Sequence, residues 1–180
     1  VVKRVSTISQ NTYLIGWWQS YKYIDSIKDT LKREVYPKYK KNSSFNKAKF
    51  WIDSKKNTVA IHIRRGDFIN TNFGILPRSY YFDALKLLME KIDNPVIVYF
   101  SDDPEWVESE LASIYEGHII SSMWDLKEYE ELVLMSLCDH HIIANSSFSW
   151  WGCWLKKNED GISIRPSRWF AKENSIINEE

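Results

Sequence analysis

The chain has 180 residues, of which 44% are hydrophobic, so it is long enough to bury one substantial core. Its 24 Lys and Arg residues are balanced by 24 Asp and Glu residues, which makes the formal net charge zero. This balance excludes a generic nucleic-acid-binding protein, which needs a basic excess, but it leaves room for a local cationic site. The 9 Trp and 10 Tyr residues suit a packed core first and a carbohydrate or nucleotide pocket second.

The two cysteines, Cys138 and Cys153, predict no disulfide framework and favour a reducing compartment. No apolar run approaches the ~20 residues of a membrane span, and no signal-peptide pattern opens the sequence. Because the sequence starts at Val1 in the middle of a pattern, we expect a fragment that lacks an N-terminal part.

The first fifty residues predict little regular structure apart from one helix. Residues 1–15 are expected to be strand-like or irregular. Apolar residues at helical spacing predict an amphipathic helix over residues 18–35, which Pro37 ends. The polar, basic stretch at residues 36–44 predicts a linker.

After Phe50 the pattern becomes regular. Strands are expected at residues 58–63, 95–100, 118–121, 141–144 and 162–164, and helices at residues 78–92, 104–114, 125–138 and 147–157. Asp125 and Glu128 are expected to form a capping box at the third of these helices. Strands that are apolar on both faces and alternate with helices predict an α/β fold, a parallel and doubly wound Rossmann-like sheet.

Polar residues follow three of these strands directly. They are Arg64, Arg65 and Asp67 after the first strand, Ser101, Asp102 and Asp103 after the second, and Asn145, Ser146 and Ser147 after the fourth. Ligands of an open parallel sheet bind beyond the carboxyl ends of its strands, so we expect these clusters along one edge.

The chemistry of the clusters suits a nucleotide diphosphate. An arginine fork matches phosphate oxygens, and Ser146 and Ser147 lie where a helix begins, so amides and hydroxyls there can hold an anion. Asp102 or Asp103 can accept hydrogen bonds from ribose hydroxyls or base N–H groups. The sequence contains neither G-x-G-x-x-G nor G-x-x-x-x-G-K-[ST]. Arginine and a helix N-terminus would therefore have to hold the phosphates.

Structural interpretations stay open for several of these residues. Asp103, before Pro104, is typical of a helix N-cap, which would leave Asp102 freer. Ser147 can serve only as the N-cap of its helix, without contacting a ligand. One of Arg64 and Arg65 is expected to form a structural salt bridge, with Asp67 as one candidate partner. Strand alternation puts His62 on the same side as Arg64, either as a satisfied core histidine or as a ligand contact.

No metal site is predicted. Cys138, His140, His141 and Cys153 match no standard zinc spacing and fall on different elements. The run Ser101–Asp103 resembles a metal-binding D-x-D only loosely. Asn42 and Asn145 begin N-x-S sequons, and we interpret the second as a coincidence because it lies at the expected ligand edge.

Six segments together resemble the α-1,2-fucosyltransferases of glycosyltransferase family 11. They are "YLIGWWQSYKYI" (13–24), "HIRRGDF" (62–68), "ILPRSYYFDAL" (75–85), "VYFSDDPEWV" (98–107), "LMSLCDHHIIANSSFSWWGCWL" (134–155) and "IRPSRWF" (164–170). The resemblance spans nearly the whole chain. The combination of His-x-Arg-Arg-x-Asp with Asn-Ser-Ser-Phe-Ser-Trp-Trp is its most specific part.

The resemblance implies a two-lobed GT-B architecture, with residues 51–180 as the C-terminal, GDP-fucose-binding lobe and residues 1–50 as the remnant of the N-terminal lobe and a linking helix. It implies inverting transfer of fucose from GDP-fucose to the 2-hydroxyl of a galactoside, without an obligatory metal or another cofactor. The family's Gly-rich N-terminal segment has no match here. A non-catalytic GDP or nucleotide-sugar-binding module is therefore the alternative, and a structural protein whose arginines only form salt bridges is a third.

The resemblance also implies roles for individual residues. Arg64 would contact the β-phosphate and stabilise the leaving GDP. Asp67 would orient an arginine, and the general base is its alternative role. His62 and Asp102 are candidates for the guanosine contacts. The remaining members of the expected donor site are Arg65, Ser146, Ser147 and Phe148. We expect a bacterial, cytoplasmic enzyme, with peripheral contact to the inner membrane left open, that acts on a galactose-terminated glycan and binds no nucleic acid.

Overall fold

The computed structural model describes residues 11, 13, 20–34, 43–69, 71 and 73–170. Contacts divide the chain into two compact units, Val1–Pro37 and Lys38–Glu180. The first unit contains two short 3-10 helices, η1 (Tyr21–Tyr23) and η2 (Asp25–Ile27), followed by α2 (Lys28–Glu34). The single helix predicted for residues 18–35 is therefore divided, and residues 18, 19 and 35 lie outside the described part.

Nearly all of the predicted irregular start and the predicted linker lie outside the described residues as well. The last two linker residues, 43 and 44, instead begin α3 (Ser43–Asp53), a helix that we did not predict. Its buried residues, Phe45, Ala48 and Ile52, lie three and four positions apart on one helical face, and α3 packs against α7. Because only three of its eleven residues form this face, the spacing that predicts a helix is hard to recognise in the sequence.

The second unit contains a five-stranded sheet in which all strand pairs are parallel. The strands are β1 (Thr58–Ile63), β2 (Val96–Ser101), β3 (Gly117–Ile119), β4 (His140–Ile142) and β5 (Ser163–Ile164), in the order β3-β2-β1-β4-β5. This sheet confirms the predicted α/β, Rossmann-like fold. Strand order reverses between β1 and β4, and this reversal is the topological switch point where such sheets bind ligands.

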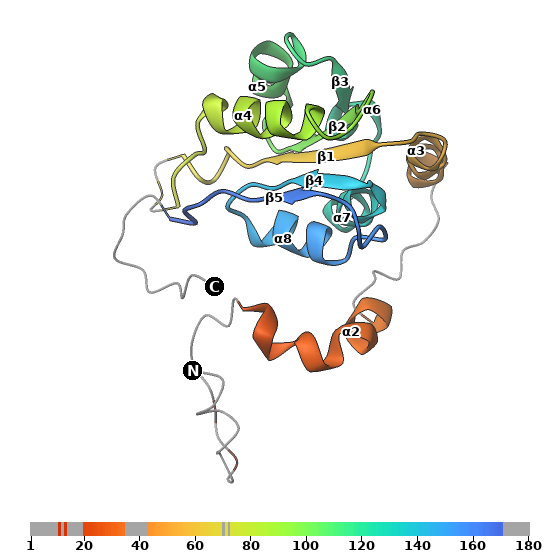
Figure 1. Ribbon diagram of the computed structural model, residues 1–180, viewed down its shortest axis with the longest axis vertical. Helices are drawn as coiled ribbons and strands as arrows, with labels where there is room; N and C mark the ends of the chain where they lie inside the picture. Colours follow the sequence, from red (N-terminus) through yellow and green to blue (C-terminus); the bar gives the residue numbers. More distant parts are fainter. Residues whose placement is uncertain are drawn as a thin grey trace. The chain divides into compact units, whose positions relative to one another are not determined.

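Helices cover both faces of the sheet (Figure 1). One face carries α4 (Arg78–Met89), α5 (Pro104–Val107) and a π-helix, η3 (Glu108–Ala112). The other face carries α7 (Glu128–Leu137) and α8 (Ser147–Trp154). This division follows from right-handed crossovers, because the chain runs outward from β1 to β3 and then returns across the sheet to β4.

Two local predictions in this unit are wrong. The third strand ends at Ile119, because Ile120 and Ser121 already belong to a short helix, α6 (Ile120–Met123). Helix α7 begins at Glu128 and not at residue 125, and the carboxylate that caps it comes from Glu130, which accepts a hydrogen bond from the Lys127 N–H at 2.8 Å. The predicted capping box of Asp125 and Glu128 is therefore two residues out of register.

The core is built around β1, which is buried along its whole length. Val59, Ile61 and Ile63 pack toward α4 and belong to a cluster that includes Leu85 and Leu88. The alternate residues of β1 face the helices on the other side, as the period of a strand requires. Burial on both faces explains why this strand reads as a continuous apolar run.

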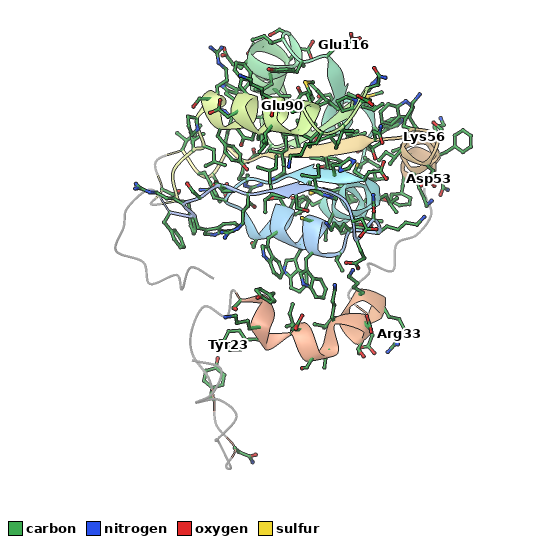
Figure 2. All side chains as sticks on the ribbon, viewed as in Figure 1. Tyr23, Arg33, Asp53, Lys56, Glu90 and Glu116 are labelled. Atoms are coloured by element: carbon green, nitrogen blue, oxygen red, sulfur yellow. The ribbon has the colours of Figure 1, made fainter. Side chains whose placement is uncertain are left out.

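The amino end of β1 is tied to the start of β4 by a side-chain pair. The Asp139 carboxylate accepts hydrogen bonds from the Thr58 N–H at 2.9 Å and from its hydroxyl at 3.0 Å. Asp53 and Lys56, at this end of the sheet, are labelled in Figure 2. The polar clusters that follow the strands lie at the opposite, carboxyl edge.

Candidate functional site

Asp102 organises the turn that follows β1. Ile63, the last residue of β1, pairs with Ser101, the last residue of β2, so the residues after them lie side by side. The two Asp102 oxygens accept hydrogen bonds from the backbone N–H groups of Arg65, at 2.9 Å, and Gly66, at 3.1 Å. A Cβ on residue 66 would lie 2.9 Å from one of these oxygens, which explains the glycine there. The predicted contact between Asp102 and guanosine stays a prediction. Both oxygens of this carboxylate already accept hydrogen bonds within the turn.

Arg65 has a structural position. Its Nε donates to the Asp103 carboxylate at 2.9 Å, and its guanidinium lies over the Trp106 ring at 4.2 Å from the centroid. Asp103 also accepts from the Trp106 N–H at 3.1 Å and is the N-cap of α5, which confirms the capping interpretation. The hydrogen bond from Arg65 lowers the pKa of Asp103. Both arginines therefore form salt bridges, Arg65 with Asp103 and Arg64 with Asp67, the partner that the sequence suggested.

Arg64 points away from that cluster. Its Nε donates to Asp67 at 2.8 Å and lies 3.3 Å from an Asp102 oxygen. Within the described residues its two terminal nitrogens have no hydrogen-bond partner, and its side chain is 34% exposed. Arg64 is therefore held at Nε while four N–H donors of its fork stay available to a ligand.

Asp67 is suited to orient Arg64. The hydrogen bond from Arg64 lowers the pKa of Asp67, and the same bond raises the pKa of Arg64. A general base works best when its pKa lies near the operating pH. The lowered pKa of Asp67 consequently favours the orienting role over that of a base.

His62 is buried beside this arginine, with 4% of its surface exposed and its ring 5.3 Å from the ring of Phe148. Burial, with a smaller contribution from the positive charge of Arg64, lowers the pKa of His62 to about 3, so the imidazole is neutral. Its Nδ1 is buried and has no partner among the described residues. Within the described part of the chain the ring is therefore incompletely satisfied, and Nδ1 can bond to another group.

The turn after β4 carries the predicted serines. Ser146 is buried and is the N-cap of α8, whereas Ser147 is exposed as the first residue of the helix, so Ser147 is not the cap. Ser146 makes no side-chain cap hydrogen bond. The amino end of this eight-residue helix therefore presents N–H groups that the Ser146 side chain does not take, next to His62 and Phe148.

The sequence analysis placed Asn145 at this edge of the sheet but gave it no role in the site. Its side-chain Nδ2 lies 3.0 Å from the Phe73 carbonyl oxygen, 3.2 Å from that of Gly74 and 3.1 Å from that of Trp169. Gly74 has a φ of 70°, which suits glycine at this close approach. The position of Asn145 after a buried strand and at the start of the Asn-Ser-Ser-Phe-Ser-Trp-Trp motif pointed to this edge, but neither signal identifies its partners. With 3% exposure its amide is inaccessible to glycosylation.

Glu131, in the first turn of α7, was missed by the sequence analysis. Burial raises the pKa of Glu131 to about 7, although its hydrogen bond with Ser121 lowers this pKa by a smaller amount. The Ser121 hydroxyl oxygen accepts the Ser101 N–H at 3.3 Å, which places Glu131 near the carboxyl end of β2. The sequence shows only an ordinary acidic residue in the first turn of a helix.

The residues considered for zinc bind separate partners. The Cys138 thiol contacts the Leu134 carbonyl, His140 accepts from the Ile162 N–H, and His141 contacts the Met135 carbonyl. Cys153 contacts the hydroxyl of Ser163. Within the part of the chain that the structure describes, no group of three His, Cys, Asp or Glu residues is arranged to hold a metal ion. In the same part, no helix has the length and apolar character needed to span a bilayer.

The fold and this edge of the sheet define a Rossmann-like α/β domain with an open arginine and a helix N-terminus at its topological switch point. The sequence model of glycosyl transferase family 11 matches residues 2–179, and the chain belongs to this family.

Three curated relatives are similar to the chain. An alpha-1,2-colitosyltransferase from Escherichia coli is 38% identical over 170 residues, which cover 88% of this chain and 56% of the relative. The O-antigen biosynthesis glycosyltransferase WbnK from Escherichia coli is 38% identical over 128 residues, 68% of this chain and 42% of the relative. A galactoside 2-alpha-L-fucosyltransferase from Caenorhabditis elegans is 26% identical over 156 residues, 83% of this chain and 44% of the relative. The chain thus spans about half the length of these relatives.

Proposed function

We propose that this chain is the donor-binding part of an inverting α-1,2-fucosyltransferase that uses GDP-fucose and a galactoside. The observation that carries the proposal is Arg64, whose Nε is held by Asp67 while its terminal nitrogens face no partner in the described residues. A fork of donors at a switch point suits a diphosphate. The family and the names of the relatives support sugar transfer by the whole protein.

In the proposed reaction the acceptor oxygen attacks C1 of fucose on the face opposite GDP. The bond between C1 and the β-phosphate oxygen breaks, its electron pair stays with GDP, and the hydroxyl proton of the acceptor passes to a base. Negative charge grows on the diphosphate, so Arg64 and the N–H groups of α8 stabilise the transition state more than the bound substrate. No metal or other cofactor is part of this proposal.

The other predicted residues have supporting roles in the proposed site. His62, neutral and with an unpartnered Nδ1, can accept a hydrogen bond from guanosine, and Phe148 packs beside it. Ser146 and Ser147 bring the helix N–H groups and a hydroxyl to the phosphates. Arg65 holds the turn through Asp103. Of the nearby carboxyl groups, Glu131 has the pKa that suits a proton acceptor at neutral pH, while Asp67 orients Arg64.

The donor sugar has a second candidate. Colitose differs from fucose by the loss of one ring hydroxyl, and one relative at 38% identity is a colitosyltransferase. A colitose donor that carries the same GDP would present the same diphosphate to Arg64, so the site around Arg64 would not separate the two sugars. We propose a bacterial enzyme on the cytoplasmic side of the membrane, which adds the sugar to a surface glycan; the name of WbnK, an O-antigen biosynthesis glycosyltransferase, supports the glycan and not the side of the membrane.

Calorimetric titration of this chain with GDP, with UDP as the matched control, tests the proposal. We expect GDP to bind more tightly than UDP, and Arg64→Ala to weaken the binding. A folded chain that binds neither nucleotide would contradict the proposed donor site. A protein extended to the length of the curated relatives should then transfer fucose or colitose from its GDP derivative, and a comparison of kcat/KM for the two donors assigns the sugar.

A further inference from the structure

Three segments that are distant in sequence meet at one side-chain amide. The Asn145 Nδ2 donates to carbonyl groups 72 and 71 positions earlier, at Phe73 and Gly74, and to one 24 positions later, at Trp169. Three carbonyl oxygens around one nitrogen fix the orientation of the amide, because a flipped amide would direct its own oxygen at them. The Asn145 Oδ1 is buried and has no partner among the described residues.

The segments that Asn145 holds also carry a stack of aromatic rings. The Phe73 ring packs on Phe68, with 5.0 Å between centroids and 18° between planes, and on Phe170 at 5.1 Å. The Arg64 guanidinium lies 5.8 Å from the centroid of the Phe68 ring, at the end of this stack. The stack therefore runs without interruption from the residues that Asn145 holds to the arginine of the site.

We propose that Asn145 is a positioning residue for the diphosphate of the donor, and that it sets the guanidinium of Arg64 through Phe73 and Phe68. The identity of the ligand rests on the proposed function, whereas the positioning itself does not. The hydrogen bonds from Asn145 fix the backbone that carries the Phe73 and Phe170 rings. The Phe73 ring in turn holds the Phe68 ring. Phe68 then limits where the Arg64 guanidinium can lie, while Asp67 holds its Nε.

A positioning role differs from a merely structural one in how it depends on Arg64. If Asn145 acts through Arg64, its removal costs affinity only while Arg64 is present. If it only stabilises the fold, its effect on affinity is the same with or without Arg64. A double-mutant cycle on GDP affinity separates the two cases.

The first experiment observes Arg64 directly. The Nε–H resonance of Arg64, assigned by its loss in Arg64→Ala, is recorded in the unmodified chain and in Asn145→Ala, Phe73→Leu and Tyr80→Phe. Phe73→Leu removes the ring stack and keeps the backbone carbonyls. Tyr80→Phe is the matched control, because the Tyr80 hydroxyl donates to the Ile143 carbonyl at 2.7 Å, also just after β4, but holds no residue of the stack. We expect the resonance to move in the first two variants and not in the control.

The second experiment is calorimetric titration with GDP, with folding of each variant verified by its unfolding midpoint. We expect Asn145→Ala and Phe73→Leu to weaken binding by roughly tenfold or more, since small misplacements of a binding group cost this much, and Tyr80→Phe to leave the affinity unchanged. In the Arg64→Ala background, Asn145→Ala should have no further effect.

The proposal is overturned if folded Asn145→Ala binds GDP normally, or if its effect persists undiminished in the Arg64→Ala background. If Asn145→Ala does not fold, Phe73→Leu decides by the same criteria. If the unmodified chain does not bind GDP, the proposed function fails while the positioning is still tested. An Arg64 resonance that stays in place in both variants then overturns it, and a resonance that moves only in them supports it.

Discussion

The turn after β1 and the turn after β4 reach the same edge of the sheet with opposite arrangements of polar groups. After β1, Arg64 pairs with Asp67 and Asp102, and Arg65 pairs with Asp103, so most of the charge is neutralised locally. After β4, Asn145 and the N-terminus of α8 carry no formal charge; among the described residues the buried Asn145 oxygen has no partner, and the Ser146 side chain does not cap the helix. Charged residues near a predicted site are thus not free by default, and neutral ones can offer more open donors and acceptors.

The largest expected effect comes from removing Arg64, whose terminal N–H groups have no hydrogen-bond partner among the described residues. Arg64→Ala should raise the barrier to sugar transfer in the complete enzyme by about 2–4 kcal/mol, since one donor to the developing charge is lost. The unfolding midpoint should change little, because this side chain is 34% exposed. Steady-state kinetics and thermal unfolding of the same variant check both parts. A large loss of stability with unchanged kcat would reverse the roles that we assign to the two arginines.

Arg65→Ala should show the opposite balance. The guanidinium of Arg65 is 19% exposed and lies between Asp103 and the Trp106 ring, so its removal should cost about 1–3 kcal/mol of unfolding free energy. Urea unfolding measures this loss, and Arg65→Lys is the control that keeps the charge without the planar fork. If Arg65→Ala weakens GDP binding more than Arg64→Ala while remaining folded, Arg65 contacts the ligand.

His62→Leu sharpens the comparison through pH. The folded-state pKa of His62 is lowered to about 3, so its contribution to stability is complete above its unfolded pKa of 6.5 and is lost as pH falls below that value. On lowering the pH from 7 to 5, the unmodified chain should lose about 1–2 kcal/mol of unfolding free energy that the leucine variant keeps. It should also bind GDP less well if Nδ1 contacts guanosine. Equal pH profiles for the two proteins would contradict a buried neutral imidazole.

Glu131→Gln should give the smallest effect on stability, with the opposite dependence on pH. The folded-state pKa of Glu131, about 7, lies above its ordinary value of 4.5, so stability falls as pH rises between these values. Glutamine cannot ionise, and the variant should be more stable by about 1 kcal/mol at pH 8 and nearly unchanged at pH 4, after allowance for partial exposure. Thermal unfolding at the two pH values measures the difference, and a variant that is less stable at pH 8 would contradict it.

The sequence predicted the strands around the site well because their residues are apolar on both faces, and β1 was placed at its observed bounds. It also located the turn of Arg64 and Arg65, since a charged run directly after a buried strand has to emerge at the sheet edge. Alternation along β1 suggested that the two arginines diverge, but it could not say that Asp103 and Trp106 would engage Arg65. Those contacts depend on the register of β1 with β2.

Other parts depend on packing between distant segments and left no local pattern. The three carbonyl partners of Asn145 lie far away in the sequence, so no spacing could identify them. The raised pKa of Glu131 comes from burial, which a helical pattern alone does not establish at the start of a helix. The capping box was misplaced because acidic residues at 125, 128, 130 and 131 offer several similar starts for α7.

The central position of β1 has a consequence for synthesis of the chain. Of the strands of this sheet the middle one leaves the ribosome first, and β2 and β3 can join it on one side while Asp139, which lies 81 residues after Thr58, has yet to emerge. During this interval the other edge of β1 exposes unpaired N–H and C=O groups beside apolar side chains, a template for pairing with a foreign strand. The nascent chain is therefore most in need of protection by a chaperone in the period between the emergence of β3 and that of β4.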